Sequence, residues 1–232
     1  MIGTQMLLQN VPIETKRTFF QNSHFFSGFS PDILLELELG SFIRKYAAGE
    51  TILVEGECCD GLYSLVSGSI KLYKLSSSGR ELIITVFEEG ITFNEVPVFD
   101  GGNNPINVGA LEESTLLIIP RDVLYRAIQK HPEQYHIIIE RLAENLRNLV
   151  QLIEELAFYQ IPNRLARLLL RLPVDHTYTQ DQLAARLGTV REVISRALRT
   201  LEKSGAIHCH RRKVEILDRS LLEVWANRPD PI

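Results

Sequence analysis

The sequence lacks the features that mark secreted and membrane proteins. It has only three cysteines, an odd number that includes the adjacent pair Cys58 and Cys59, which is a poor basis for a disulfide framework. The N-terminus shows no basic segment followed by an apolar core, and no apolar run approaches the length of a membrane span. We therefore expect a protein of the reducing cytoplasm that does not enter a membrane.

Catalytic sequence motifs are also missing. There is no P-loop, no nucleophile elbow, and no Gly-x-Gly-x-x-Gly that opens a helix after a strand. Gly101-Gly102 lies in a loop without the Gly-Lys-Ser/Thr that a phosphate-binding loop requires. These absences argue against an enzyme.

Charge is divided unevenly along the chain, whose net charge is −4. Residues 1–159 contain 12 Lys and Arg against 21 Asp and Glu, a net charge of −9, whereas residues 160–232 contain 13 against 8, a net charge of +5. The division suggests two domains with different partners, of which the C-terminal one tolerates a polyanion.

The region from about Tyr46 to Ile119 reads as short strands separated by Gly-rich turns, a pattern typical of an antiparallel barrel or sandwich. Pro31–Ile43, before it, reads as a helix. We predict an α+β protein with an N-terminal antiparallel β-barrel of the jelly-roll kind. The strands are expected at Thr51–Val54, Tyr63–Val66, Ile70–Leu75 and Glu81–Phe87.

A long helix is expected to begin near Pro132 and to end at Gln160–Pro162, because proline cannot continue a helix. Its apolar residues step by four and three through three heptads, a period that favours a seam between two helices. Packing of this helix on its own domain is the alternative. The predicted seam, hence the dimer interface, comprises Tyr135, Ile139, Leu142, Leu146, Leu149, Ile153 and Leu156.

Two short helices joined by Gly188 follow, which is a helix-turn-helix pattern. Capping boxes are predicted at Thr179–Gln182 and at Thr189–Glu192. After Gly205, two strand-like segments flank the basic run Arg211-Arg212-Lys213, which predicts a hairpin that would form the wing of a winged helix.

The ordered set of barrel turns, long helix, hinge and winged helix-turn-helix, ending in Arg191-Glu-Val-Ile-Ser-Arg196, resembles the family of the cyclic AMP receptor protein and FNR, which are bacterial transcription regulators. The resemblance covers about Phe25 to Leu222. It implies an effector-sensing domain at 1–131, a dimerisation helix at 132–159 and a DNA-binding domain at 160–232. It also implies a homodimer, double-stranded DNA as partner and RNA polymerase as a further partner.

In the resembling proteins the second helix of this motif enters the major groove, where Arg pairs with guanine and Glu accepts from cytosine. The resemblance thus assigns base reading to Arg191, Glu192, Ser195 and Arg196 and implies a half-site with a TGA core. For Glu192, a helix-capping carboxylate is the alternative. Phosphate contacts fall to Thr179, Thr189, Arg199, Arg211, Arg212 and Lys213. A solvated turn is the alternative for the wing.

The effector pocket departs from the family pattern. The Gly-Glu that holds the ribose of a cyclic nucleotide is Asn94-Glu95 here, and Pro105 and Ile106 stand where Arg-Ser would hold the phosphate. Loss of that cation argues against cyclic AMP and leaves a small molecule or a gas as the effector. The expected pocket comprises Phe93, Asn94, Glu95, Val96, Asn104, Ile106, Asn107 and Leu142.

Cofactor chemistry is only partly constrained. An FNR-type iron–sulfur cluster needs four thiolates and the chain has three cysteines, one of them in the wing. A haem-based sensor of the same family stays open, with His24, His131, His136, Cys58 or Cys59 as axial ligands. The segment His208-Cys209-His210 predicts no convergent metal site, because alternate residues of a strand face apart. A binding module or enzyme whose helix-turn-helix is only structural is the alternative of another class.

Overall fold

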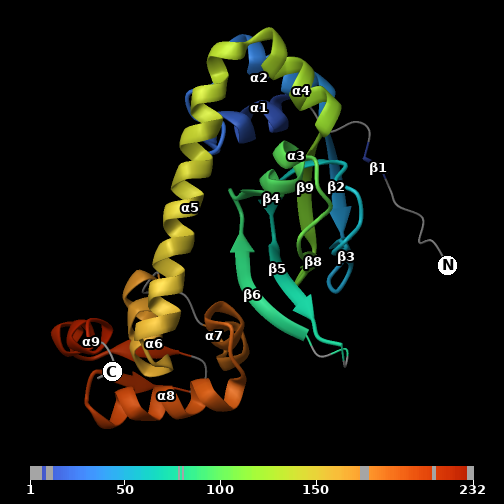
Figure 1. Ribbon diagram of the computed structural model, residues 1–232. Coiled ribbons are helices and arrows are strands. Elements are labelled where there is room, and N and C mark those ends of the chain that lie inside the picture. Colours follow the sequence, from blue (N-terminus) through green and yellow to red (C-terminus); the bar gives the residue numbers. More distant parts are fainter. Residues whose placement is uncertain are drawn as a thin grey trace. The chain divides into compact units, whose positions relative to one another are not determined.

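The computed structural model describes residues 7–8, 13–77, 79, 81–172, 178–210 and 213–228. The chain divides into two compact units. The first comprises Met1–Leu82 with Val86–Ala143, and the second comprises Ile83–Thr85 with Glu144–Ile232. The division falls inside one continuous helix, α5, which runs from Tyr135 to Phe158 (Figure 1).

Two sheets form the body of the first unit, and the strand pairs whose registers are described are antiparallel. The predicted strands and their Gly-rich turns are confirmed. The larger sheet has the order β1 (Leu7–Leu8), β2 (Phe42–Tyr46), β9 (Ser114–Pro120), β4 (Gly61–Ser67) and β7 (Thr92–Phe93). The smaller sheet has the order β3 (Thr51–Leu53), β8 (Asn107–Ala110), β5 (Ser69–Leu75) and β6 (Glu81–Glu88).

Strand β9 shows how the layers are held together. Leu116 and Ile118 point into the core between the sheets, whereas Leu117 and Ile119 point into a second core beneath the helices. Side chains alternate between the faces of a strand, so a run of consecutive buried apolar residues such as Leu116–Ile119 is covered on both faces. The larger sheet is therefore the middle layer of this unit.

Short helices cover the outer face of that sheet: α1 (Ile13–Asn22), α2 (Pro31–Gly40) and α4 (Arg121–Lys130), with a 3₁₀ turn at Pro132–Gln134 (Figure 1). The predicted helix Pro31–Ile43 ends earlier, at Gly40, because Phe42 and Ile43 pair with β9 as strand β2. No helix among the described residues is long and apolar enough to span a membrane.

Helix α5 begins on this helical layer and leaves an apolar stripe open. Ile137 and Ile138 are buried in the core beneath the helices, and Leu142 is half-buried against it. The other six residues of the predicted seam are 42–63% exposed within a single chain. They are Tyr135, Ile139, Leu146, Leu149, Ile153 and Leu156.

The composition of the stripe has the pattern of a parallel two-stranded coiled coil. β-branched Ile139 and Ile153 occupy two of the positions that favour branched residues, and Leu149 and Leu156 lie at the alternate positions. The positions beside the stripe carry no charge. They are His136, Ile138, Ala143, Asn145, Val150, Leu152 and Ala157, none of which is Asp, Glu, Lys or Arg.

The second unit is a small helical domain with a two-stranded sheet. Helix α5 ends at Phe158 and α6 begins at Ile161, with Pro162 in its first turn, as predicted. The rest consists of α6 (Ile161–Arg171), α7 (Gln180–Leu187), α8 (Arg191–Lys203), β10 (Ile207–Cys209), β11 (Val214–Ile216) and α9 (Arg219–Ala226). One apolar core, including Leu165, Leu183, Ile194 and Leu201, joins all four helices.

Helix α6 orders this unit with polar side chains that satisfy the ends of other helices. Buried Arg164 donates to the carbonyl of Leu187 at the end of α7 (2.9 Å). Asn163 donates to the carbonyls of Trp225 (2.9 Å) and Arg228 (3.0 Å) at the end of α9. Terminal carbonyls have no partner inside their own helix, so these contacts fix where α7 and α9 stop.

Candidate nucleic-acid interface

The turn between α7 and α8 has a fixed geometry at both of its ends. Thr179 caps α7 as predicted, because its hydroxyl accepts from the Gln182 amide (3.2 Å) and its amide donates to Gln182 Oε1 (2.8 Å). Gly188 ends the helix with φ at +62°, a conformation open to glycine without steric cost. The helix-turn-helix prediction is confirmed.

The second predicted capping box, at Thr189–Glu192, is wrong. The amides of Gly188 and Thr189 donate back to the carbonyls of Ala185 (3.3 Å) and Ala184 (3.0 Å), so Thr189 belongs to the end of α7. The N-cap of α8 is Val190, which has no side-chain oxygen to offer. Glu192 therefore does not cap this helix, and the capping explanation for its carboxylate falls away.

Helix α8 separates its two faces as the sequence predicts. Ile194, Ala197, Leu198 and Leu201 are buried in the core. The opposite face carries exposed Arg191, Glu192, Arg196 and Arg199, with half-buried Ser195 between them. Among the described residues, the side chains of Glu192, Arg196 and Arg199 have no hydrogen-bond or ion-pair partner, so they remain available to an external ligand.

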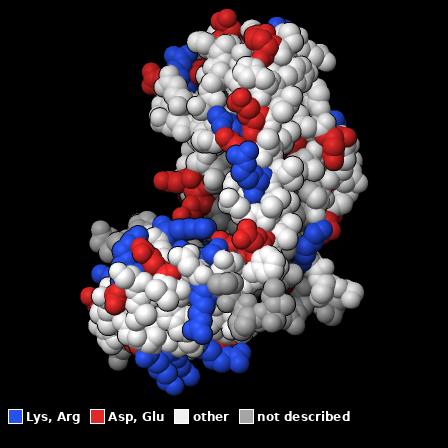
Figure 2. All heavy atoms as spheres, turned by 60° about the vertical axis from the view of Figure 1, so that its left-hand side comes forward, with Lys and Arg blue, Asp and Glu red and all other residues white. Residues whose placement is uncertain are grey.

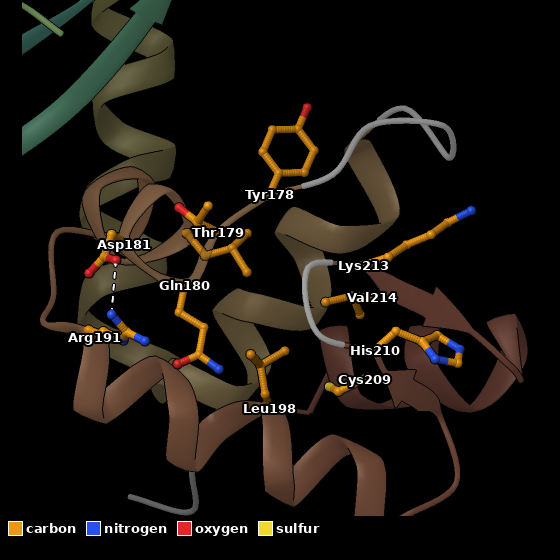
Figure 3. A pocket seen from close by; sticks show the side chains of 11 residues that line it. Tyr178, Thr179, Gln180, Asp181, Arg191, Leu198, Cys209, His210, Lys213 and Val214 are labelled. Carbon is orange, nitrogen blue, oxygen red and sulfur yellow. Dashed lines mark hydrogen bonds and ion pairs between the residues drawn. The ribbon is translucent and has the colours of Figure 1, made fainter.

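Three of the predicted DNA contacts line one hollow of about 250 Å³ between α7, α8 and the hairpin: Thr179, Arg191 and Lys213. Figure 3 shows these side chains around the opening, with Asp181 joined to Arg191. Arg196 and Arg199 lie farther along α8 and do not line the hollow, and Thr189 is half-buried in the turn.

The predicted wing is a hairpin in which Ile207 pairs with Ile216 and Cys209 with Val214. Cys209 is half-buried, and burial, reinforced by Glu202, raises the pKa of its thiol to about 11. His208 lies 3.1 Å from Glu202, and the rings of His208 and His210 meet edge to face. Among the described residues no cluster of three or more potential metal ligands forms. Arg211 and Arg212 lie outside the described residues.

Basic side chains gather on the unit that carries these helices. In Figure 2, Lys and Arg side chains crowd the lower part of the molecule, which holds α6–α9 in Figure 1. The sequence beyond residue 159 has a net charge of +5, which agrees with the basic side chains seen on this face. Such a surface attracts a polyanion at long range.

The predicted effector pocket begins at Asn94, which is the only described non-glycine residue with a positive φ, at +74°. Asparagine tolerates this left-handed conformation better than most residues, so the backbone keeps a shape suited to glycine. Its amide donates to the Gly61 carbonyl (3.0 Å) and contacts Cys59 Sγ (3.4 Å). Burial raises the pKa of the Cys59 thiol.

The remaining pocket residues do not form one cluster. Phe93 and Ile106 pack in the core between the sheets, whereas Leu142 packs in the other core. Buried Asn107 accepts from the Glu55 amide (3.0 Å) and donates to the Tyr73 carbonyl (3.3 Å). Buried Asn104 donates to Val54 O (3.4 Å), while Glu95 is half-buried and Val96 is exposed.

The five candidate haem ligands are dispersed. His131 lies between the carboxylates of Glu36 (3.8 Å) and Glu133 (3.6 Å), while His24, His136 and Cys58 are exposed. A second hollow of about 400 Å³ is lined by Asp60, Arg121, Asp122 and Tyr125. Neither of these two hollows is lined by His24, His131, His136, Cys58 or Cys59.

Sequence reasoning missed polar residues that act across elements. Arg164 is a buried guanidinium whose pKa is lowered by burial, and nothing in its position on an apolar helix distinguishes it from a solvated arginine. Glu155 at the end of α5 pairs with Arg167 (3.4 Å) and Arg171 (3.3 Å) of α6. Asp181 is detectable in the sequence, because it is an acid at the start of a helix-turn-helix within a segment of net positive charge.

Comparison with known proteins identifies both units. The model of the cyclic nucleotide-binding domain matches residues 43–131, and that of the Crp-like helix-turn-helix domain matches residues 163–225. The fold also resembles the solved structure of FixK2 from Bradyrhizobium japonicum, with a TM-score of 0.69 over 81% of this chain and 98% of that chain at 23% identity.

Two curated relatives align along nearly their whole length. The cyclic AMP receptor protein of Thermus thermophilus is 30% identical over 210 residues, which cover 88% of this chain and 96% of that protein. A CRP-like cAMP-activated global transcriptional regulator of Mycobacterium tuberculosis is 28% identical over 209 residues, which cover 85% and 93%.

Proposed function

Because the chain belongs to the CRP/FNR family of DNA-binding transcription regulators, whose members are not enzymes, we propose that it reads a palindromic DNA site as a homodimer. One observation carries the proposal: the outer face of α8 presents two arginines and a carboxylate at its first two turns, on a basic unit. A regulator with this role works in the cytoplasm, where the DNA is.

Base reading falls to Arg191, Glu192, Ser195 and Arg196. An arginine can donate two hydrogen bonds to guanine O6 and N7, and a glutamate can accept one from the cytosine amino group. Since Glu192 does not cap its helix, its carboxylate is free for such a contact. A half-site with a TGA core is the sequence that we expect these side chains to select.

Phosphate contacts position the protein and fall to residues around the readers. Thr179 and Lys213 line the hollow beside Arg191. Arg199 extends the contact along α8, Thr189 contributes from the turn, and Arg211 and Arg212 contribute from the wing. Such contacts supply affinity without sequence preference.

The second copy is proposed to pack along the open stripe of α5. Six apolar side chains that are about half exposed in the single chain support this, because a monomer gains nothing from leaving them in water. Parallel packing of two such helices would bring two copies of α8 to successive major grooves, whose spacing is one helical turn of DNA.

The effector is proposed to be a small molecule or gas other than cyclic AMP. Support comes from the segment between Glu95 and Ala110, which contains no Lys or Arg to hold a phosphate, although the relatives above are named for cyclic AMP. Asn94 retains the backbone shape of the family turn, so the pocket itself is proposed to persist with different ligand chemistry.

The signal is proposed to pass through the junction of α5 and α6. Glu155 is paired with Arg167 and Arg171, and the Arg167 guanidinium lies 3.7 Å above the Tyr159 ring while its Nε donates to the Ala226 carbonyl. These contacts couple the end of α5 to α6 and α9. An effector can shift the position of α8 only by binding one arrangement of this junction better than another.

Random-sequence selection followed by binding measurements tests the DNA-reading role. We expect Arg196→Ala to weaken binding to the selected palindrome by about 5- to 150-fold, the worth of one bidentate base contact, with little effect on an unrelated duplex. Arg219→Ala on α9 removes the same charge and serves as the control. Equal losses for both variants would show that Arg196 reads no base.

The effector proposal has its own test. We expect calorimetric titration with cyclic AMP at millimolar concentration to give no binding heat, and the affinity for the selected palindrome to be unchanged by cyclic AMP. Saturable binding would show that the missing arginine is replaced by another group. RNA polymerase is the partner proposed for the DNA-bound dimer, and transcription from a promoter carrying the selected site would test it.

A further inference from the structure

An acidic side chain lies on the surface where DNA phosphates are expected. Asp181 occupies the first turn of α7, two residues after the proposed phosphate ligand Thr179, and both side chains line the hollow beside the wing. A carboxylate at such a place repels the DNA backbone. Since the surrounding side chains include Lys213 and Arg191, its presence needs a reason.

Asp181 contacts the first base-reading residue directly. Its Oδ2 lies 3.3 Å from Nη1 of Arg191, and the contact links two helices across the turn (Figure 3). Thr179 caps α7 through both bonds of its capping box, and Gly188 ends it in a left-handed conformation, so the backbone that carries Asp181 is hydrogen-bonded at the start of α7. The carboxylate is therefore an anchored acceptor for a long side chain.

The contact leaves Arg191 able to donate elsewhere. A guanidinium carries five N–H donors in one plane, and Asp181 engages only Nη1, so Nη2 and Nε remain for an acceptor pair such as guanine O6 and N7. An arginine without such a contact samples many rotamers and loses that freedom when it binds a base. Holding the guanidinium beforehand reduces this loss.

We propose that Asp181 is a positioning residue that orients the Arg191 guanidinium for base reading, so that Asp181 contributes to sequence selectivity although it contacts no base. The inference rests on the proposed function, since it assigns a role within the same DNA site. In the free protein the pair is exposed and contributes little to stability. The ion pair should matter more in the DNA complex, because DNA displaces water from around the two charges and their attraction is then less screened.

The proposal and its opposite differ in sign. If Asp181 only repelled phosphates, its removal would strengthen binding to every sequence equally. If Asp181 withheld Arg191 from DNA, its removal would strengthen binding to the selected site above all. If Asp181 positions Arg191, its removal strengthens binding to unrelated DNA, because one negative charge is lost, and weakens discrimination at one base pair.

The experiment uses the full chain and two duplexes that differ at one base pair. That base pair is identified as the one at which Arg191→Ala loses discrimination. We expect Asp181→Asn to reduce discrimination at that pair by about threefold to tenfold, part of the worth of the Arg191 contact, while the pair read by Arg196 keeps its full discrimination. Asp181→Glu, which retains a carboxylate, is expected to recover most of the loss.

Two controls separate positioning from a fold defect. The exposed pair predicts an unchanged thermal midpoint for Asp181→Asn, and in an Arg191→Ala background the Asp181→Asn change should leave discrimination where it is. Unchanged or improved discrimination in Asp181→Asn alone would overturn the inference. Failure of the wild-type chain to prefer any duplex would instead overturn the proposed function.

Discussion

The two units use their polar side chains in opposite ways. In the sandwich, Asn94 and Asn107 turn inward and hydrogen-bond neighbouring strands and turns, so that they hold the fold. On α8, Arg196 and Arg199 point outward and have no partner among the described residues. The difference indicates that the proposed DNA-binding surface leaves these two cations unpaired in the described part of the free chain, whereas residues expected to hold the effector also stabilise the two sheets.

We expect the largest effect from a mutation in the exposed apolar stripe of α5. Like the cations of α8 these side chains face outward, but they are apolar. Leu149→Glu would place two carboxylates in the proposed seam, so we expect the dimer dissociation constant to rise by about 100-fold or more, with loss of binding to the palindrome. Sedimentation and fluorescence anisotropy measure both quantities. Gln151→Glu, on another face of the helix, is the control, and a Leu149→Glu protein that remains dimeric would place the interface elsewhere.

Arg164 is a cation of the second unit that faces inward, unlike Arg196 and Arg199, so it tests the contrast between inward and outward polar side chains. Arg164→Ala removes the donor to the Leu187 carbonyl, and we expect the free energy of unfolding to fall by about 2–3 kcal/mol, the worth of a buried charged hydrogen bond. Thermal melting should show a midpoint lower by about 5–10 °C. Arg171→Ala, an exposed change on the same helix, should alter stability by less than about 1 kcal/mol.

Asn107→Ala tests the corresponding group in the sandwich. It removes the bonds to Glu55 N and Tyr73 O, and we expect the free energy of unfolding to fall by about 1–3 kcal/mol. Asn103→Ala, an exposed asparagine in the segment before β8, is the control. If Asn107→Ala melts like the wild type but no longer responds to an effector, then this side chain serves the ligand rather than the fold.

The smallest effect is expected from a single outward cation of the wing. Lys213→Ala should lower the salt dependence of DNA binding by about one unit of slope, equally for the palindrome and for unrelated duplexes. Its effect on stability should be negligible because the side chain is exposed. Lys203→Ala, at the far end of α8, is the control. An unchanged slope for Lys213→Ala would show that Lys213 does not contact a DNA phosphate.

Elements with a strong local signal could be predicted from the sequence. The strands of the sandwich, the break at Pro162 and the two faces of α8 follow from periodicity and from single residues such as Gly188. The predicted start of α8 was wrong by one residue. The backbone hydrogen bonds that place Thr189 at the end of α7 cannot be recognised from the spacing of residue types in the sequence. The backbone hydrogen bonds that end α7 therefore decide where α8 begins, although Thr189 is the residue with a capping side chain.

Contacts between distant segments could not be predicted. Arg164 resembles any helical arginine until the end of α7 is placed beside it, and Asn107 resembles a loop residue until β3 and β5 flank it. The exposed face of α8 could be predicted, because the spacing of apolar residues in an amphipathic helix shows which side faces outward. The effector residues are separated across loops and two cores, and their spacing alone carries no comparable signal.

The uncharged flanks of the α5 stripe have a consequence for handling the molecule. With no Asp, Glu, Lys or Arg on those flanks, a concentrated sulfate or phosphate salt has no such ion pair to screen there and, because it is excluded from protein surface, we expect it to tighten the proposed pairing of helices. The same electrolyte competes with the basic face for nucleic acid. The two proposed assemblies, the pair of subunits and its complex with DNA, should therefore respond to such a salt in opposite directions: we expect a wash to release bound polynucleotide and to leave the two subunits together.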